Sequence, residues 1–122
     1  MKEKKAETSI SKNEAIALCK KNNLDMRGNI TFSSRNKGTN TYWANPNIKC
    51  LNEEWWIIFN DIKKRELHIC HIPVNKMNEG QIIVRNDKPH QIDIQINYND
   101  ESFIDSRSGI NFNKWYVKKL SY

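Results

Sequence analysis

The sequence lacks an apolar run long enough to cross a bilayer. A membrane-spanning helix needs ~18 or more consecutive apolar residues, and none of the 122 residues belongs to such a run. The opening residues Met1 to Lys5 are charged and are not followed by the hydrophobic region of a secretory signal. We therefore expect a cytoplasmic protein without a membrane partner.

Cysteine, glycine and proline are also scarce. The three cysteines are an odd number at wide spacing, which argues against a disulfide framework and predicts a reducing compartment. Only four glycines and three prolines argue against wholesale disorder. Four residues each of Trp, Tyr and Phe suffice to anchor one core. The length then predicts a flexible leader at residues 1–9 and a single domain at residues 10–122.

The clearest local signal predicts a helix at the start of this domain. Ser11 followed by Glu14 matches a capping box. Behind them, Ala15, Leu18 and Cys19 recur at helical spacing, so we expect a short amphipathic helix that ends near Asn23.

From residue 30 onward the hydrophobic pattern has the period of two that is typical of strands. We expect strands at residues 30–34, 39–43, 54–62, 66–74, 81–85 and 91–98. Residues 111–114 predict a turn before a final edge strand, although Phe112, Trp115, Tyr116 and Leu120 also fit one face of a helix. The sequence predicts an α+β fold, in which one N-terminal amphipathic helix precedes a six- to seven-stranded, mainly antiparallel curved sheet or half-barrel.

The expected strand at residues 54–62 is apolar on both faces. Trp55, Ile57 and Phe59 point one way, and Trp56 and Ile58 point the other. One short helix covers one face, so the second face needs a different cover. We expect sheet curvature or the aromatic tail to provide it, through Phe103, Phe112 and Trp115; the alternative is a partner molecule.

The positive charge belongs to the first half of the chain. Residues 1–50 carry ten Lys or Arg against four Asp or Glu, whereas residues 51–122 carry ten of each kind. A field of one sign attracts polyanions, and nucleic acid is the commonest of these in a cytoplasm. The alternative is that the basic composition only aids solubility.

Residues 26–52 contain no acid and alternate cations with aromatic side chains. Lys and Arg neutralise phosphates, while flat rings stack on bases. The leading interpretation is therefore a small non-catalytic module, without a cofactor, that binds nucleic acid or a ribonucleoprotein. Its candidate contact residues are Arg27, Phe32, Arg35, Lys37, Tyr42, Trp43 and Lys49.

Two other functions remain open. A small interaction or inhibitor protein, for example one encoded by a phage or mobile element, would place exposed aromatics on a protein partner. A degenerate metal-dependent nuclease would use Asp61 and Glu66 as its acids, although no complete nuclease motif surrounds them.

The sequence predicts no catalytic residue and no metal ligand. His68 and Cys70 share one face of a strand, but His71 points to the other face. No Cys-x-x-Cys pair supplies the missing ligands of a zinc site. Semi-buried core positions explain these residues better.

Overall fold

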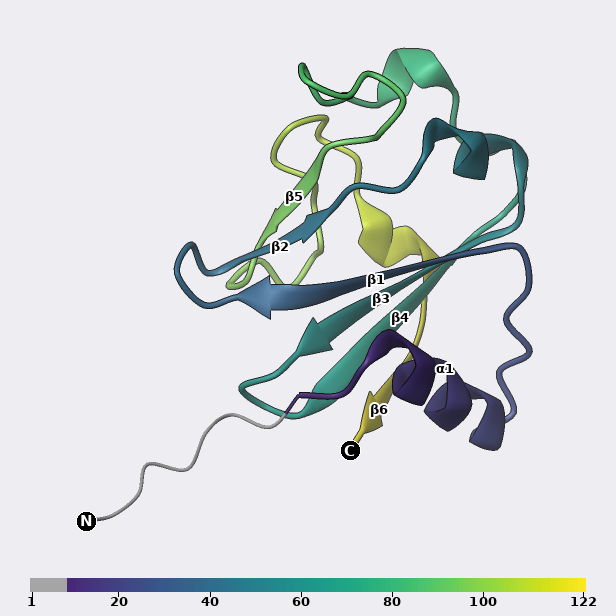
Figure 1. Cartoon of the computed structure of the whole chain (residues 1–122), viewed down its shortest axis with the longest axis vertical. Coiled ribbons are helices and arrows are strands. Elements are labelled where there is room, and N and C mark those ends of the chain that lie inside the picture. Colours follow the sequence, from purple (N-terminus) through teal and green to yellow (C-terminus); the bar gives the residue numbers. More distant parts are fainter. Residues whose placement is uncertain (1–8) are drawn as a thin grey trace.

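The computed structural model describes residues 9–122 and has the α+β class that the sequence predicts. One α-helix, α1 (Lys12–Lys21), lies against an open sheet of six strands (Figure 1). The strands are β1 (Asn29–Asn36), β2 (Thr41–Ala44), β3 (Trp55–Asp61), β4 (Glu66–Ile72), β5 (Ile94–Asn97) and β6 (Tyr116–Ser121). Three short 3₁₀ turns connect them, η1 (Ile48–Asn52), η2 (Glu79–Gln81) and η3 (Phe112–Trp115).

Residues 1–8, which include most of the predicted leader, lie outside the described residues. Within residues 9–122, no helix combines the length and the hydrophobicity that crossing a bilayer requires.

The capping box starts α1 as predicted. The Ser11 hydroxyl accepts a hydrogen bond from the Glu14 amide at 3.1 Å, and the Ser11 amide donates to the Glu14 carboxylate at 2.9 Å. Lys20 and Lys21 lie in the last turn, where positive charge is favourable against the helix dipole.

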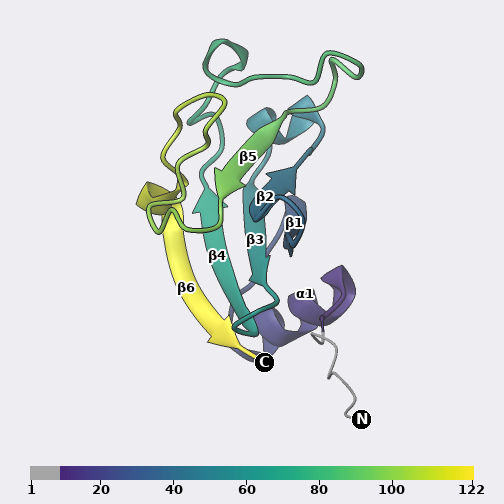
Figure 2. The same ribbon diagram turned by 90° about the vertical axis from the view of Figure 1, so that its left-hand side faces the viewer.

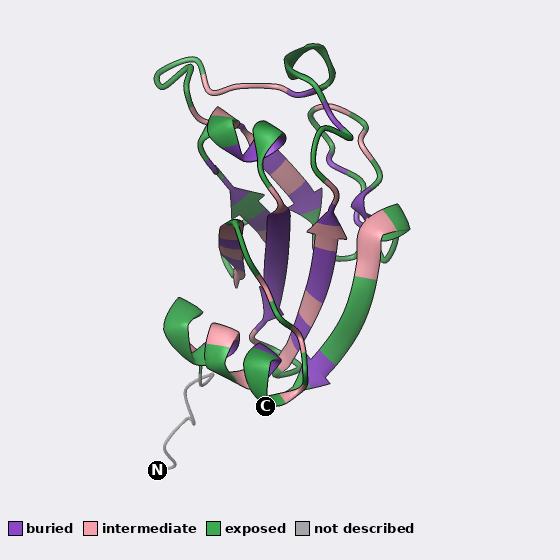
Figure 3. Cartoon of the chain, turned by 90° about the vertical axis from the view of Figure 1, so that its right-hand side faces the viewer, coloured by how far each residue is buried: buried purple, intermediate pink, exposed green. Residues whose placement is uncertain are grey.

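The sheet is mixed, with the strand order β5-β2-β1-β3-β4-β6. β1 pairs parallel with β3, while the other neighbours are antiparallel. The parallel pair was not predicted. After β2 the chain passes through η1 and returns to the far side of β1, which gives β3 an interior position. That position suits a strand whose residues are all buried (Figure 3).

The two faces of β3 belong to two hydrophobic cores. On the face toward α1, Trp56 and Ile58 pack with Ala15 and Cys19 of the helix. On the opposite face, Trp55, Ile57 and Phe59 pack with Tyr42, the isoleucines of β5, Phe103 and Phe112. The aromatic tail therefore covers the second face, as expected, and Figure 1 shows the segment around η3 on the side away from α1.

The prediction of a strand at residues 81–85 is wrong. The Gln81 amide donates to the Asn78 carbonyl within η2, and Val84 makes only an isolated bridge to Ile92. The Arg85 side chain pairs with Asp87, and the backbone bends at residues 86–87. The tail prediction is confirmed, since η3 is followed by β6, which pairs with β4 at the sheet edge (Figure 2).

Candidate functional site

A pocket of about 610 Å³ opens on the sheet face away from α1, and we call it the sheet pocket. The β3–β4 hairpin, β6 and the loop after β5 build most of its wall. Its lining residues are Tyr42, Asp61, Lys64, Glu66, His68, Tyr98, Asn99, Asp100, Glu101, Phe103, Asn113, Tyr116 and Lys119.

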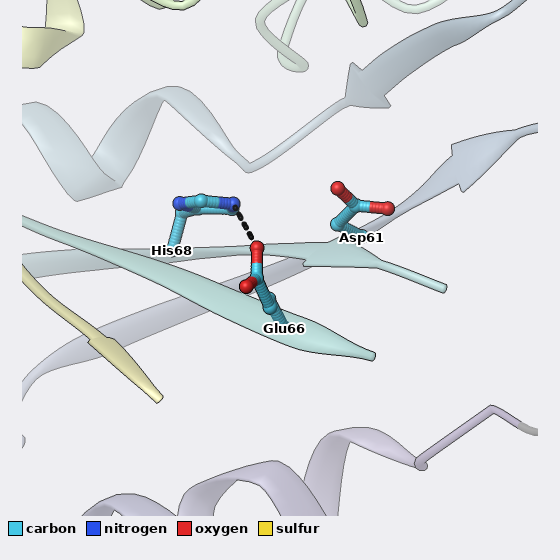
Figure 4. A group of neighbouring side chains, drawn as sticks. All are labelled: Asp61, Glu66 and His68. Atoms are coloured by element: carbon cyan, nitrogen blue, oxygen red, sulfur yellow. Dashed lines mark ion pairs between the residues drawn. The ribbon is translucent and has the colours of Figure 1, made fainter. Parts of the chain in front are cut away.

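Two carboxylates and an imidazole meet inside this pocket. Asp61, the last residue of β3, is paired across the hairpin with Glu66, the first residue of β4. His68 follows Glu66 by two positions and therefore shares its face of the sheet. One ligand atom from each residue lies within 4.8 Å of the other two (Figure 4). We call these three residues the Asp61–Glu66–His68 cluster.

Asp61 is held in place from two directions. The Tyr98 hydroxyl donates toward both carboxylate oxygens, at 3.0 and 2.9 Å, and the Lys64 backbone amide donates to Oδ1 at 3.1 Å. The residue is 3% exposed. Its carboxylate therefore has a fixed orientation in a nearly dry environment.

His68 lies partly buried between Tyr116 and Glu66. Burial lowers the pKa of His68, and the nearby carboxylates of Glu66 and Asp61 oppose that shift only in part. Nδ1 lies 2.7 Å from the Tyr116 hydroxyl. Nε2 lies 3.8 Å from a Glu66 carboxylate oxygen, a contact too long for a hydrogen bond (Figure 4). The Nε2 edge of the ring thus faces the carboxylates without being bonded to them.

The lining of the sheet pocket carries more acidic than basic side chains. Four acidic residues and two lysines line it. Lys119 Nζ lies 3.5 Å from Glu66, while Lys64 is exposed at the hairpin turn. Because Asp100 and Glu101 lie in the loop after β5, the acids are not confined to the β3–β4 hairpin, and a phosphate is attracted only close to the two lysines.

The chain matches no family model, no curated protein and no solved structure. The role of the sheet pocket is therefore argued from its own residues.

One of the predicted contact residues lines the sheet pocket, and a second contacts a residue of its wall. Tyr42 lines it, although the ring is buried in the core. The Arg35 guanidinium lies 4.5 Å from the centre of the Tyr98 ring and donates to the Asn40 side chain at 2.9 Å. Both residues therefore support the pocket wall from the β1–β2 hairpin.

The other five predicted residues lie elsewhere. Phe32 packs into the core beneath α1, and Arg27 forms an ion pair with Asp25 at 2.7 Å. Trp43, 46% exposed, borders a separate hollow that Arg85 and Arg107 also line. Lys37 and Lys49 are exposed in the β1–β2 turn and in η1. The seven residues are distributed over several surfaces.

Sequence reasoning missed the Asp61–Glu66–His68 cluster as a unit. The sequence indicates Asp61 and Glu66 as the acids of a possible nuclease, and it favours a semi-buried core position for His68 over a zinc ligand. The available signal was the β3–β4 hairpin itself, because it pairs the two acids and aligns His68 beside them. The contributions of Tyr98, Tyr116 and Lys119 come from distant segments and had no local signal.

Proposed function

We propose that this protein binds nucleic acid and holds the phosphate backbone at the margins of the sheet pocket. The observation that carries this proposal is the position of Lys64 and Lys119, which border one pocket from the β3–β4 turn and from β6. Tyr98 and Tyr116 lie in the same wall. Cations beside aromatic rings are the chemistry that non-specific nucleic-acid binding uses.

The surroundings of the sheet pocket add positive charge. Lys63, Lys64 and Arg65 are consecutive exposed residues of the β3–β4 turn. Arg35 lies over the Tyr98 ring, although it does not line the pocket itself. Because phosphate contacts supply most of the affinity of non-specific binding, these side chains favour a backbone-directed mode without a sequence preference.

Binding is tested by a salt-titrated gel shift with short single- and double-stranded DNA and RNA. We expect the double variant Lys64→Ala, Lys119→Ala to bind about tenfold more weakly, with a salt slope reduced by about two, because each phosphate contact contributes about one. The matched control is Lys20→Ala, Lys21→Ala, which removes the same charge from the end of α1. Equal losses in the two variants, or no binding by the unaltered protein, would contradict the proposal.

A metal-dependent nuclease is the second candidate, and the proximity of Asp61, Glu66 and His68 favours it. A divalent ion beside a bound phosphate polarises the phosphoryl group and supplies a hydroxide nucleophile. Plasmid DNA and RNA incubated with Mg²⁺ or Mn²⁺ should then be cut by the unaltered protein but not by Asp61→Asn. An absence of products at high protein concentration would exclude this candidate and leave the binding proposal intact.

A further inference from the structure

We infer that the Asp61–Glu66–His68 cluster is a binding site for one divalent first-row transition-metal ion, such as Mn²⁺, Fe²⁺, Co²⁺ or Zn²⁺. Two carboxylates and one imidazole each offer an atom within 4.8 Å of the others. Ligands held at about 2.1 Å from one ion lie about 3–4 Å from each other. Small side-chain rotations are therefore enough to close the cluster around an ion.

The charge balance of the cluster calls for a cation. Asp61 is only 3% exposed. Within the described part of the chain, its carboxylate accepts hydrogen bonds but forms no ion pair. Glu66 stands directly opposite it in the sheet and is approached by one amine, that of Lys119. Two like charges at paired positions destabilise a sheet, and buried charges are normally paired or bound to metals. A divalent ion resolves both problems.

The imidazole decides which class of metal fits. Mg²⁺ and Ca²⁺ prefer shells made of oxygen, whereas imidazole nitrogen favours transition metals. Binding requires the tautomer in which Nδ1–H donates to the Tyr116 oxygen, because this tautomer leaves the Nε2 lone pair free.

Tyr116 and Tyr98 act as positioning residues for this site. Tyr116 fixes the ring plane and tautomer of His68, and Tyr98 fixes the Asp61 carboxylate through both oxygens. Hydrogen bonds of this kind to metal ligands are worth about 10–100-fold in metal affinity. The remaining coordination positions of the ion face the sheet pocket, where water or a phosphate oxygen can occupy them.

This inference deepens the nuclease candidate, because it names the class of ion at the same three residues. It does not depend on the nucleic-acid proposal, because an ion can bind whether or not a nucleic acid does. The test is isothermal titration of the EDTA-treated, dialysed protein with Mn²⁺, Co²⁺, Zn²⁺, Mg²⁺ and Ca²⁺ in separate runs. We expect one transition-metal ion per chain, with Mg²⁺ and Ca²⁺ at least tenfold weaker. The visible absorption of bound Co²⁺ reports the geometry of its ligands.

Substitutions in the cluster test whether the ion binds to these side chains. Asp61→Asn and His68→Gln should each weaken Mn²⁺ binding at least tenfold, and Tyr116→Phe should weaken it about tenfold while keeping the ring. The matched control, Glu79→Gln, removes an exposed acid outside the sheet pocket and should bind as the unaltered protein does. Circular dichroism checks that each variant is folded.

Three results would overturn the inference: no binding of any transition metal at millimolar concentration, equal binding by folded His68→Gln, or equal affinity for Mg²⁺ and Mn²⁺. Metal binding without a gel shift would leave the inference standing and remove the nucleic-acid proposal. The two failures are therefore distinguishable.

Discussion

Gly28 fixes the backbone where the loop after α1 enters β1. Its φ is +79°, in the left-handed region that side chains disfavour, and a Cβ built there would overlap the carbonyl oxygen of Glu54. That carbonyl accepts a hydrogen bond from the Asn29 amide at 2.8 Å, next to the parallel pairing of β1 with β3. The close approach of the two segments thus depends on a residue without a side chain.

We predict that Gly28→Ala lowers the free energy of unfolding by about 2–4 kcal/mol, because strain at positive φ adds to a steric overlap with backbone. Urea denaturation measures the change. Gly109→Ala is the matched control, since Gly109 has a φ of +83° but open space around its Cβ direction, and only the strain of about 1 kcal/mol should remain. Equal losses at the two positions would show that the Glu54 contact is unimportant.

At the scale of elements, the N-terminal cap of α1 stabilises the helix that covers one face of the sheet. We predict that Ser11→Ala lowers the free energy of unfolding by about 1 kcal/mol, because the Glu14 amide loses its acceptor. Chemical denaturation followed by circular dichroism measures this loss. Ser102→Ala, at an exposed loop serine, should change stability by less than about 0.5 kcal/mol. A comparable loss in both variants would argue against the cap.

The elements that could be predicted from the sequence are those with a local signal. The capping box of α1, the two-faced apolar pattern of β3 and the turn before β6 are all contained in short windows. The parallel pairing of β1 with β3 could not be predicted, because a period of two does not identify a strand's neighbour. Residues 81–85 resemble a strand in composition, but the capped turn at η2 precedes them and only Val84 finds a bridge partner.

The candidate site was less predictable than the elements for the same reason. Asp61 and Glu66 flank one tight turn, so their proximity follows from the hairpin alone. Tyr98 and Tyr116 reach the cluster from positions 37 and 48 residues away along the chain, and only the folded sheet brings them there. The sequence alone therefore indicates the two acids, but not the two tyrosines that complete the site.

At the scale of the whole molecule, the three cysteines report how cooperatively the two cores open. Cys19 lies in the core beneath α1, while Cys50 and Cys70 lie in the core on the other face. Burial raises the pKa of Cys19 to about 11 and those of Cys50 and Cys70 to about 12. The reactive thiolate is thus nearly absent from the folded protein at neutral pH.

We predict that a thiol reagent at pH 8 labels the native protein only as fast as it unfolds, and labels three thiols per chain in guanidinium chloride. The raised pKa values also give the direction of a pH effect. The buried thiols contribute fully to stability at pH values below about 9, the pKa of a cysteine in the unfolded chain. This contribution is lost as the pH rises from there through the pKa values of the folded protein. Labelling of one cysteine ahead of the others would show that the cores open separately.

The late position of residues 98–119 in the chain has a consequence for synthesis. When α1 and β1 to β4 have emerged from the ribosome, Trp55, Ile57 and Phe59 are exposed to water while Phe103 and Phe112 have not yet left the exit tunnel. During that interval the nascent sheet is a target for chaperones or for aggregation. Tyr116 and Lys119 emerge later still, so the wall of the sheet pocket is incomplete until β6 has left the exit tunnel.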